Sequence, residues 1–184
     1  MHEQPGLLGP GVRHRKRHQF VACRAVHVTQ RVRPGVGFLR KQGPAQTILA
    51  AIRAAATGGQ MRIAHYSVQG SHLHFVVEAD GTAALSLGMQ GLAIRIARRL
   101  NARLGRKGPV FADRYHARVL SSPREVGNAI RYVVGNYRHH TREHLPARFR
   151  DPLATGAHEP LEMPRLWLLR VGWHTLTPRP FQPP

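Results

Sequence analysis

The sequence predicts an α+β fold built on a split βαβ antiparallel sheet, and two kinds of pattern support this. Segments in which apolar and polar residues alternate are typical of strands, because neighbouring side chains of a strand point to opposite faces. Segments with apolar residues three and four positions apart are typical of helices that pack one side against a core. Along the chain these segments follow the order strand, helix, strand, strand, helix, strand, helix.

The ends of several elements carry the residues that helices and turns favour. The expected strands lie within residues 20–32, 61–68, 71–79 and 106–120, and the expected helices within 44–59, 82–104 and 121–139. Pro44 stands near the start of the first helix and Gly58 near its end. Gln69-Gly70 separates two apolar strands as a hairpin turn would, and Ser122-Pro123 suits the start of the last helix. The first six elements match a ferredoxin-like layout, which leaves one sheet face free for a ligand or for the additional C-terminal helix.

One domain with an extension at each end accounts for the 184 residues. Residues 1–19 are basic and rich in Gly and Pro, which predicts a flexible arm. Residues 20–144 hold all the predicted elements. Prolines punctuate residues 145–184, which we interpret as an extension docked by Trp167 and Trp173.

Positive charge dominates the composition. The chain has 28 Lys and Arg against 9 Asp and Glu, a formal net charge of +19. Such a charge attracts polyanions, and nucleic acid is the first candidate, although a solvated basic surface is the alternative. Because acidic residues are scarce, an active site built from carboxylates alone is disfavoured.

The sequence also predicts where the protein works. Its single cysteine, Cys23, gives neither a disulfide framework nor a cysteine-based zinc site, which fits a reducing compartment. No run of eighteen apolar residues occurs, and the basic first residues lack the apolar core of a signal peptide. We therefore expect a cytoplasmic, nucleoid-associated protein with no membrane partner.

His72-Leu73-His74 in the second arm of the predicted hairpin is the strongest local motif. Side chains two apart on a strand share a face, so both imidazoles would point the same way and Leu73 the other. Imidazole is the commonest protein ligand for metals, so the pair would form a two-ligand platform. Two histidines that are solvated, or buried in the core of a small RNA-associated protein, are the alternatives.

Tyr132 and Asn136 lie four positions apart on the last predicted helix, and therefore on one side of it. If that side meets the histidines, a phenol, an amide oxygen and two imidazoles converge. A divalent ion held there could polarise a phosphodiester, and the tyrosine oxygen could attack phosphorus. The alternative is that Tyr132 only packs its ring.

Other side chains compete for these roles or add to them. We interpret Tyr66 and Tyr115 as packing or base-stacking residues, and Tyr137 as facing away from Tyr132. The candidate phosphate contacts are four arginines, with solvated side chains as the alternative: Arg95, Arg98, Arg99 and Arg114.

These motifs, in this order, carry a family resemblance. His-Leu-His in a strand, a long basic helix, FADRYHARVL and SPREVGNAIRYVVGNYRHH resemble the single-tyrosine HUH transposases, and most of all the REP-associated tyrosine transposases, from about Ala25 to about His140. The resemblance implies a ferredoxin-like enzyme that cuts and rejoins single-stranded DNA with Mg²⁺ or Mn²⁺ through a 5′-phosphotyrosine.

The resemblance also implies a role for each site residue. It makes His72 and His74 metal ligands, Tyr132 the nucleophile and Asn136 the third ligand. The implied partner is single-stranded DNA, with hairpin or repeat ends, bound by a monomer or a homodimer.

The chain departs from the family pattern at two positions near the tyrosine. Many REP-type members have histidine where this chain has Val134, and proline where it has Tyr137. These departures support an alternative function, that of a noncatalytic module that binds single-stranded DNA or structured RNA.

Overall fold

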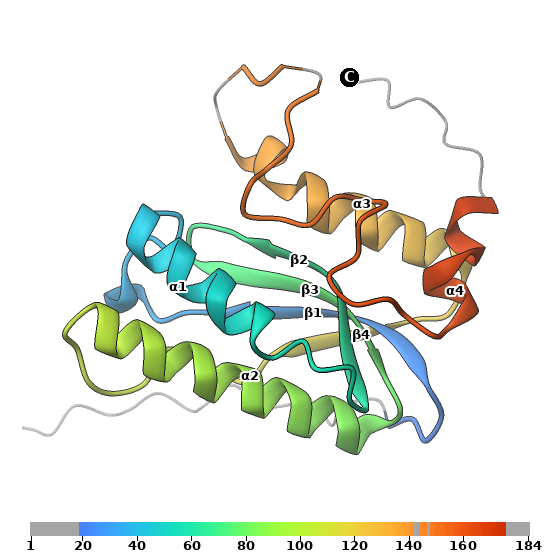
Figure 1. The fold of residues 1–184 in the computed structure, drawn as a ribbon, viewed down its shortest axis with the longest axis horizontal. Coiled ribbons are helices and arrows are strands. Elements are labelled where there is room, and N and C mark those ends of the chain that lie inside the picture. Colours follow the sequence, from blue (N-terminus) through green and yellow to red (C-terminus); the bar gives the residue numbers. More distant parts are fainter. Residues whose placement is uncertain (1–18, 142–143, 147, 176–184) are drawn as a thin grey trace, which may run out of the picture.

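The computed structural model describes residues 19–141, 144–146 and 148–175, and its centre is one antiparallel sheet of four strands. The strands are β1 (Arg24–Arg31), β2 (Met61–Val68), β3 (His72–Ala79) and β4 (His116–Leu120). Their order across the sheet is β2-β3-β1-β4, with β1 paired to both β3 and β4 (Figure 1). This order confirms the predicted ferredoxin-like α+β fold.

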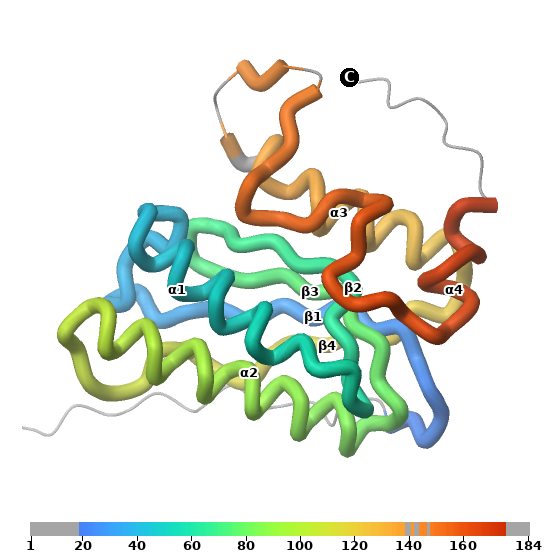
Figure 2. The backbone as a smooth tube through the Cα atoms, viewed as in Figure 1, coloured from blue at the N-terminus to red at the C-terminus, as the bar shows by residue number. Residues whose placement is uncertain are grey.

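The helices divide between the two faces of the sheet. They are α1 (Gln42–Arg53), α2 (Thr82–Arg103), α3 (Pro123–His140) and α4 (Trp167–Arg170), with 3-10 turns at Pro34–Val36 and Gly172–Thr175. Figures 1 and 2 show α1 and α2 together on one face, and α3 with α4 on the opposite face. The additional helix therefore covers the face that the split βαβ unit leaves open, as predicted.

Alternation along β3 separates two apolar clusters. Leu73 and Phe75 belong to the larger cluster, which is shared with α1 and α2. Val76 points the other way, into a smaller cluster with α3 and the C-terminal segment. His72 and His74 share the parity of Val76, so they face α3.

The turn between β2 and β3 fixes where β3 begins. The backbone N–H of Gln69 donates to the carbonyl of His72 (2.9 Å), and the N–H of Leu39 donates to the carbonyl of Gly70 (2.8 Å). A Cβ at Gly70 would overlap the ring of Phe38, so glycine suits this close approach. The turn thus holds His72 at the first position of the strand.

Two predicted elements are shorter in the structure. The first helix ends at Arg53, because Ile52 is its last core residue; Gly58 (φ 68°) lies in the turn that leads into β2. The first strand starts at Arg24 and not at Phe20, whose backbone N–H and carbonyl are bonded to Thr82 at the start of α2 (2.8 and 2.9 Å).

The C-terminal segment runs along the outer edge of β2. The backbone N–H of Val68 donates to the carbonyl of Leu153, and the N–H of Leu161 donates to the carbonyl of Ala64 (2.9 and 2.8 Å). These bonds satisfy main-chain groups that an edge strand would otherwise expose.

Of the predicted arm and extension, residues 1–18, 147 and 176–184 lie outside the described residues.

Candidate metal and nucleophile site

His72 and His74 form the floor of the site. Their ring centroids are 4.6 Å apart and the ring planes are perpendicular (90°). His74 is buried, whereas His72 at the start of β3 is partly exposed. The two imidazoles therefore lie side by side on the α3 face, with one of them reachable from solvent.

Tyr132 of α3 lies directly over this floor. Its ring centroid is 5.2 Å from that of His74, edge-on at 78°, and the residue is 43% exposed. The phenol thus stands between the imidazoles and solvent, where an incoming ligand would meet it. The fold thus brings the predicted nucleophile against His74, one of the predicted metal ligands.

Asn136 occupies a position where α3 otherwise buries apolar side chains. Val126, Ile130 and Val133 form the stripe that packs on the sheet, and Asn136 continues it one turn further on. Asn136 is 0% exposed, and neither polar atom of its amide has a hydrogen-bond partner among the described residues. Because an unpaired buried amide is costly, such a group calls for a ligand. Imidazole nitrogens and an amide oxygen are ligand types that divalent ions accept.

Two side chains of β1, which the sequence analysis did not single out, complete the surroundings of His74. Nε2 of His27 lies 3.3 Å from Nδ1 of His74, and Oγ1 of Thr29 lies 3.1 Å from the same nitrogen. Burial, with a smaller contribution from nearby His116 and Arg118, lowers the pKa of His27 to about 4. His27 is therefore neutral at neutral pH.

A pocket of about 350 Å³ opens beside Tyr132, between β1, β4 and the first half of α3. At its mouth Arg118 donates to Glu125 across 2.9 Å, and both side chains reach solvent. The hydrogen bond from the backbone N–H of Ser121, followed by that from Arg118, lowers the pKa of Glu125. The pocket therefore offers a cation, a carboxylate and the amide of Asn128 next to the tyrosine.

The four predicted phosphate contacts do not gather at this site. Arg95, Arg98 and Arg99 are exposed on α2, on the opposite side of the sheet from Tyr132. Arg114 is exposed just before β4, two residues from His116, which pairs with Thr29. Of the four, Arg114 is the one placed at the end of the sheet that carries His74.

The other tyrosines are engaged elsewhere. Tyr66 is buried in the cluster beneath α1 and α2, and Tyr115 packs against that cluster with its hydroxyl 3.3 Å from Oγ of Ser86. Tyr137 lies under the guanidinium of Arg40, 3.7 Å from the ring centroid. None of these three rings lies against His74 in the part of the chain that the structure describes.

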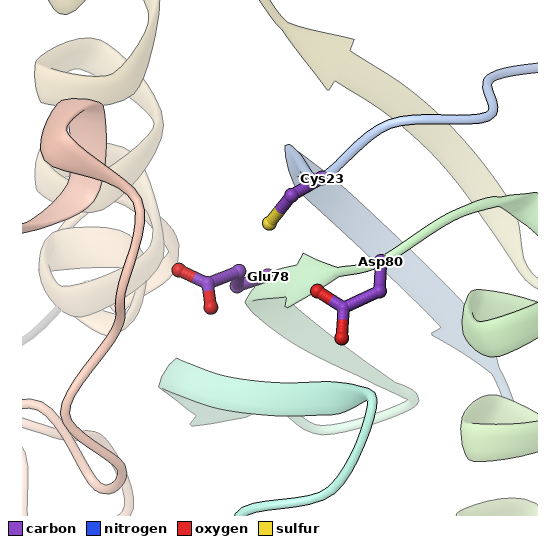
Figure 3. Close-up of side chains that lie close together, drawn as sticks. All are labelled: Cys23, Glu78 and Asp80. Atoms are coloured by element: carbon purple, nitrogen blue, oxygen red, sulfur yellow. The ribbon is translucent and has the colours of Figure 1, made fainter.

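A second group of possible metal ligands lies at the far end of β3. Cys23, Glu78 and Asp80 place one ligand atom each within 4.8 Å of one another (Figure 3). Glu78, however, already accepts hydrogen bonds from Arg62 and from two backbone N–H groups of the C-terminal segment. Burial, followed by the charge of Glu78, raises the pKa of Cys23 to about 11, so its sulfur stays a thiol. We interpret this cluster as structural.

Within the described residues, no helix is long and apolar enough to cross a membrane. A scan against protein-family models finds no match, and neither does a search of curated proteins.

Solved structures do share the fold. A structure described as the REP-associated tyrosine transposase bound to a REP hairpin superposes with a TM-score of 0.61 at 13% identity, covering 78% of this chain and 82% of that chain. A putative transposase from Deinococcus radiodurans R1 gives a TM-score of 0.45 at 16% identity, covering 59% of this chain and 87% of that chain. The resemblance to REP-associated tyrosine transposases is thereby confirmed as a likeness of fold.

Proposed function

We propose that this protein is a metal-dependent endonuclease and strand transferase that acts on single-stranded DNA through a phosphotyrosine. The observation that carries the proposal is the contact between Tyr132 and His74, with ring centroids 5.2 Å apart. A tyrosine edge-on to one histidine of a neighbouring pair, on the same helix as a buried amide that has no hydrogen-bond partner among the described residues, suits attack by a phenol on a phosphodiester held at an ion.

Each residue has a distinct part in this reaction. His72, His74 and Asn136 would hold Mg²⁺ or Mn²⁺. The bound ion would act as a Lewis acid that polarises the phosphodiester. The Tyr132 oxygen attacks phosphorus and loses its proton to solvent, while the bond to the 3′ oxygen breaks and that oxygen takes up a proton. The products are a 5′-phosphotyrosine and a free 3′-hydroxyl. Attack by another 3′-hydroxyl on the phosphotyrosine releases Tyr132 and completes strand transfer.

Charge and fold together support the proposed substrate class. The net charge of +19 favours a polyanion, and the fold is that of a protein whose structure is described with a bound REP hairpin. We therefore propose single-stranded DNA with hairpin or repeat ends as the substrate, met at the nucleoid. Because Tyr132 and the histidines come from one chain, a monomer would suffice for cleavage.

A denaturing-gel assay for a covalent protein–DNA complex tests the proposal. Labelled single-stranded hairpin DNA is incubated with the protein, with and without Mn²⁺. We expect an adduct that requires Mn²⁺ and disappears in Tyr132→Phe and in His74→Ala. Tyr137→Phe, on the same helix but beneath Arg40, is the matched control and should keep the adduct. DNA binding without any adduct across a panel of hairpins and flanks would overturn the enzymatic proposal.

One observation favours a noncatalytic binding module instead. Val134 packs against the apolar cluster between α3 and the C-terminal segment. Many REP-associated tyrosine transposases have histidine at the corresponding position. That position therefore contributes an apolar contact and no ligand. Under this alternative Tyr132→Phe binds DNA as the wild type does, and neither protein forms an adduct.

A further inference from the structure

The Nδ1 atom of His74 is held by two side chains of the neighbouring strand. Thr29 lies directly opposite His74 in the β1–β3 register, with Oγ1 3.1 Å from Nδ1. His27, two residues earlier on the same face of β1, places Nε2 3.3 Å from that nitrogen, and the two rings are stacked with centroids 5.4 Å apart. The contacts come from central strands, whose positions are fixed by pairing on both sides.

The proton between the two histidines can be placed in two ways. If Nε2 of His27 donates to Nδ1 of His74, then neutral His74 carries its own proton on Nε2 and has no lone pair left for a metal ion. If Nδ1 of His74 donates to Nε2 of His27, Nε2 of His74 carries the lone pair. The hydroxyl of Thr29 can accept or donate, so it is compatible with either arrangement.

We propose that His27 and Thr29 are positioning residues that hold His74 as the Nδ1–H tautomer, so that its Nε2 binds the metal ion. The choice of the Nδ1–H form rests on the proposed function, because that form leaves Nε2 a lone pair for the ion, whereas the contacts of His27 and Thr29 with Nδ1 are observed independently of it. In metal sites, a group that is hydrogen-bonded to the non-coordinating ring nitrogen of a histidine ligand fixes the orientation and the tautomer of that imidazole.

His27 acts through His74 and is not itself a ligand. Its Nε2 is directed at the neighbouring imidazole. Among the described residues, the cluster whose ligand atoms all lie within 4.8 Å of one another is Cys23, Glu78 and Asp80, and the three histidines do not form such a set. A positioning role therefore accounts for His27 better than coordination does.

The tautomer can be read directly in the metal-free protein. The imidazole ¹⁵N shifts of His74, recorded by NMR at alkaline pH where the ring is neutral, distinguish Nδ1–H from Nε2–H. We expect Nδ1–H in the wild type and in Thr29→Ser, which keeps the hydroxyl. We expect a shift toward Nε2–H in Thr29→Val and in His27→Ala. An Nε2–H tautomer in the wild type would overturn the proposal.

Mn²⁺ affinity gives a second readout, measured by calorimetry on variants whose circular dichroism matches the wild type. Thr29→Val and His27→Ala should each weaken binding by about 10- to 100-fold. Thr29→Ser should bind as the wild type does, and His27→Gln should recover part of the loss because its amide oxygen can accept from Nδ1.

Three outcomes separate this inference from the proposed function. If the wild type shows the Nδ1–H tautomer but binds no Mn²⁺, the proposed function fails and the positioning role stands. If His27→Ala abolishes Mn²⁺ binding while Thr29→Val changes neither tautomer nor affinity, His27 is a ligand and the positioning role is wrong. If neither substitution changes either readout, the positioning role is also wrong.

Discussion

Asn136 lies where the packing of α3 calls for an apolar side chain. Its amide is fully buried, and neither polar atom is paired within the described residues. Burying such a group costs about 1–3 kcal/mol in proteins. We therefore expect Asn136→Leu to raise the free energy of unfolding by about 1 kcal/mol or more, and to weaken Mn²⁺ binding. Urea unfolding and Mn²⁺ titration of the same preparation measure the two effects.

Val133 provides the control for this substitution. It is a fully buried apolar neighbour on the same stripe of α3. Val133→Ala should lower the free energy of unfolding, because it removes buried methyl groups, and should leave Mn²⁺ affinity nearly unchanged. If Asn136→Leu destabilised the protein and kept full Mn²⁺ affinity, the amide would be a structural group and not a ligand.

His65 makes stability depend on pH. Burial lowers the pKa of His65 to about 4, with nearby His158 adding to the effect and a hydrogen bond to the backbone of Gly156 opposing it. The unfolded chain has a histidine pKa of about 6.5, so between these values the unfolded state binds a proton that the folded state does not. The free energy of unfolding should therefore fall as pH is lowered through this window, by up to about 1.4 kcal/mol per pH unit.

The comparison of wild type with His65→Gln isolates this contribution from that of other groups. The variant can keep a hydrogen bond to Thr155, whose Oγ1 is 3.1 Å from Nδ1 of His65, but it does not titrate. Its unfolding free energy, measured by urea titration at intervals from about pH 7 to about pH 4, should fall less steeply. Parallel curves for the two proteins would contradict the assigned pKa.

Local sequence was enough to predict one half of the site, and not the other. The spacing of His72 and His74 predicts a shared face, because that depends only on the alternation of one strand. His27 has the same alternation, but its approach to His74 depends on the register between β1 and β3. Register joins residues 47 positions apart and has no local signature, so this contact could not be predicted.

The C-terminal segment is tied to the sheet through one buried carboxylate. Glu78 on β3 is fully buried and accepts from Arg62 (2.8 Å) and from the backbone N–H groups of Arg165 and Leu166 (2.7 and 2.6 Å). Removing one partner of such a pair leaves the other charge buried without compensation. We expect Glu78→Ala to lower the free energy of unfolding by about 3–5 kcal/mol, and to speed proteolysis of the C-terminal segment.

Glu159 gives a matched comparison. It forms an ion pair with Arg150 at 2.9 Å, but both side chains are mostly exposed. Exposed pairs contribute at most about 1 kcal/mol, so Glu159→Ala should change urea unfolding little. Equal losses in the two variants would show that Glu78 does not hold the segment.

Elements with a clear period were predicted closely, and elements that depend on distant partners were not. The helix expected within 82–104 is α2, Thr82–Arg103, because apolar residues at spacings of three and four run along its whole length. Along the edge of β2 the backbone of Leu161 bonds to Ala64. That pairing uses main-chain groups, which carry no sequence signal. The sequence therefore predicted an extension docked by Trp167 and Trp173, and not its path along β2.

Charge is spread over both faces of the molecule, although the candidate site occupies one. Arg98 and Arg99 are exposed on α2, a helix without any acidic residue, and the sheet separates them from Tyr132. Arg118, by contrast, lies in the pocket beside the tyrosine. A DNA strand bound at Tyr132 would have to pass around the edge of the β-sheet before its phosphates reached α2.

Because the sheet separates them, Arg98 and Arg99 on α2 should affect DNA binding differently from Arg118 in the pocket. The slope of log affinity against log salt is negative, and each lost phosphate contact to single-stranded DNA should reduce its magnitude by about 0.7. If single-stranded DNA flanking a hairpin reaches α2, the double substitution of Arg98 and Arg99 by alanine should reduce that magnitude by about 1.4. At saturating DNA it should leave the rate of adduct formation unchanged, whereas Arg118→Ala should slow adduct formation. Fluorescence anisotropy over a salt series and single-turnover gels measure the two quantities. An unchanged salt slope in the double variant would confine the bound DNA to the face that carries α3, and the arginines of α2 would then be solvated.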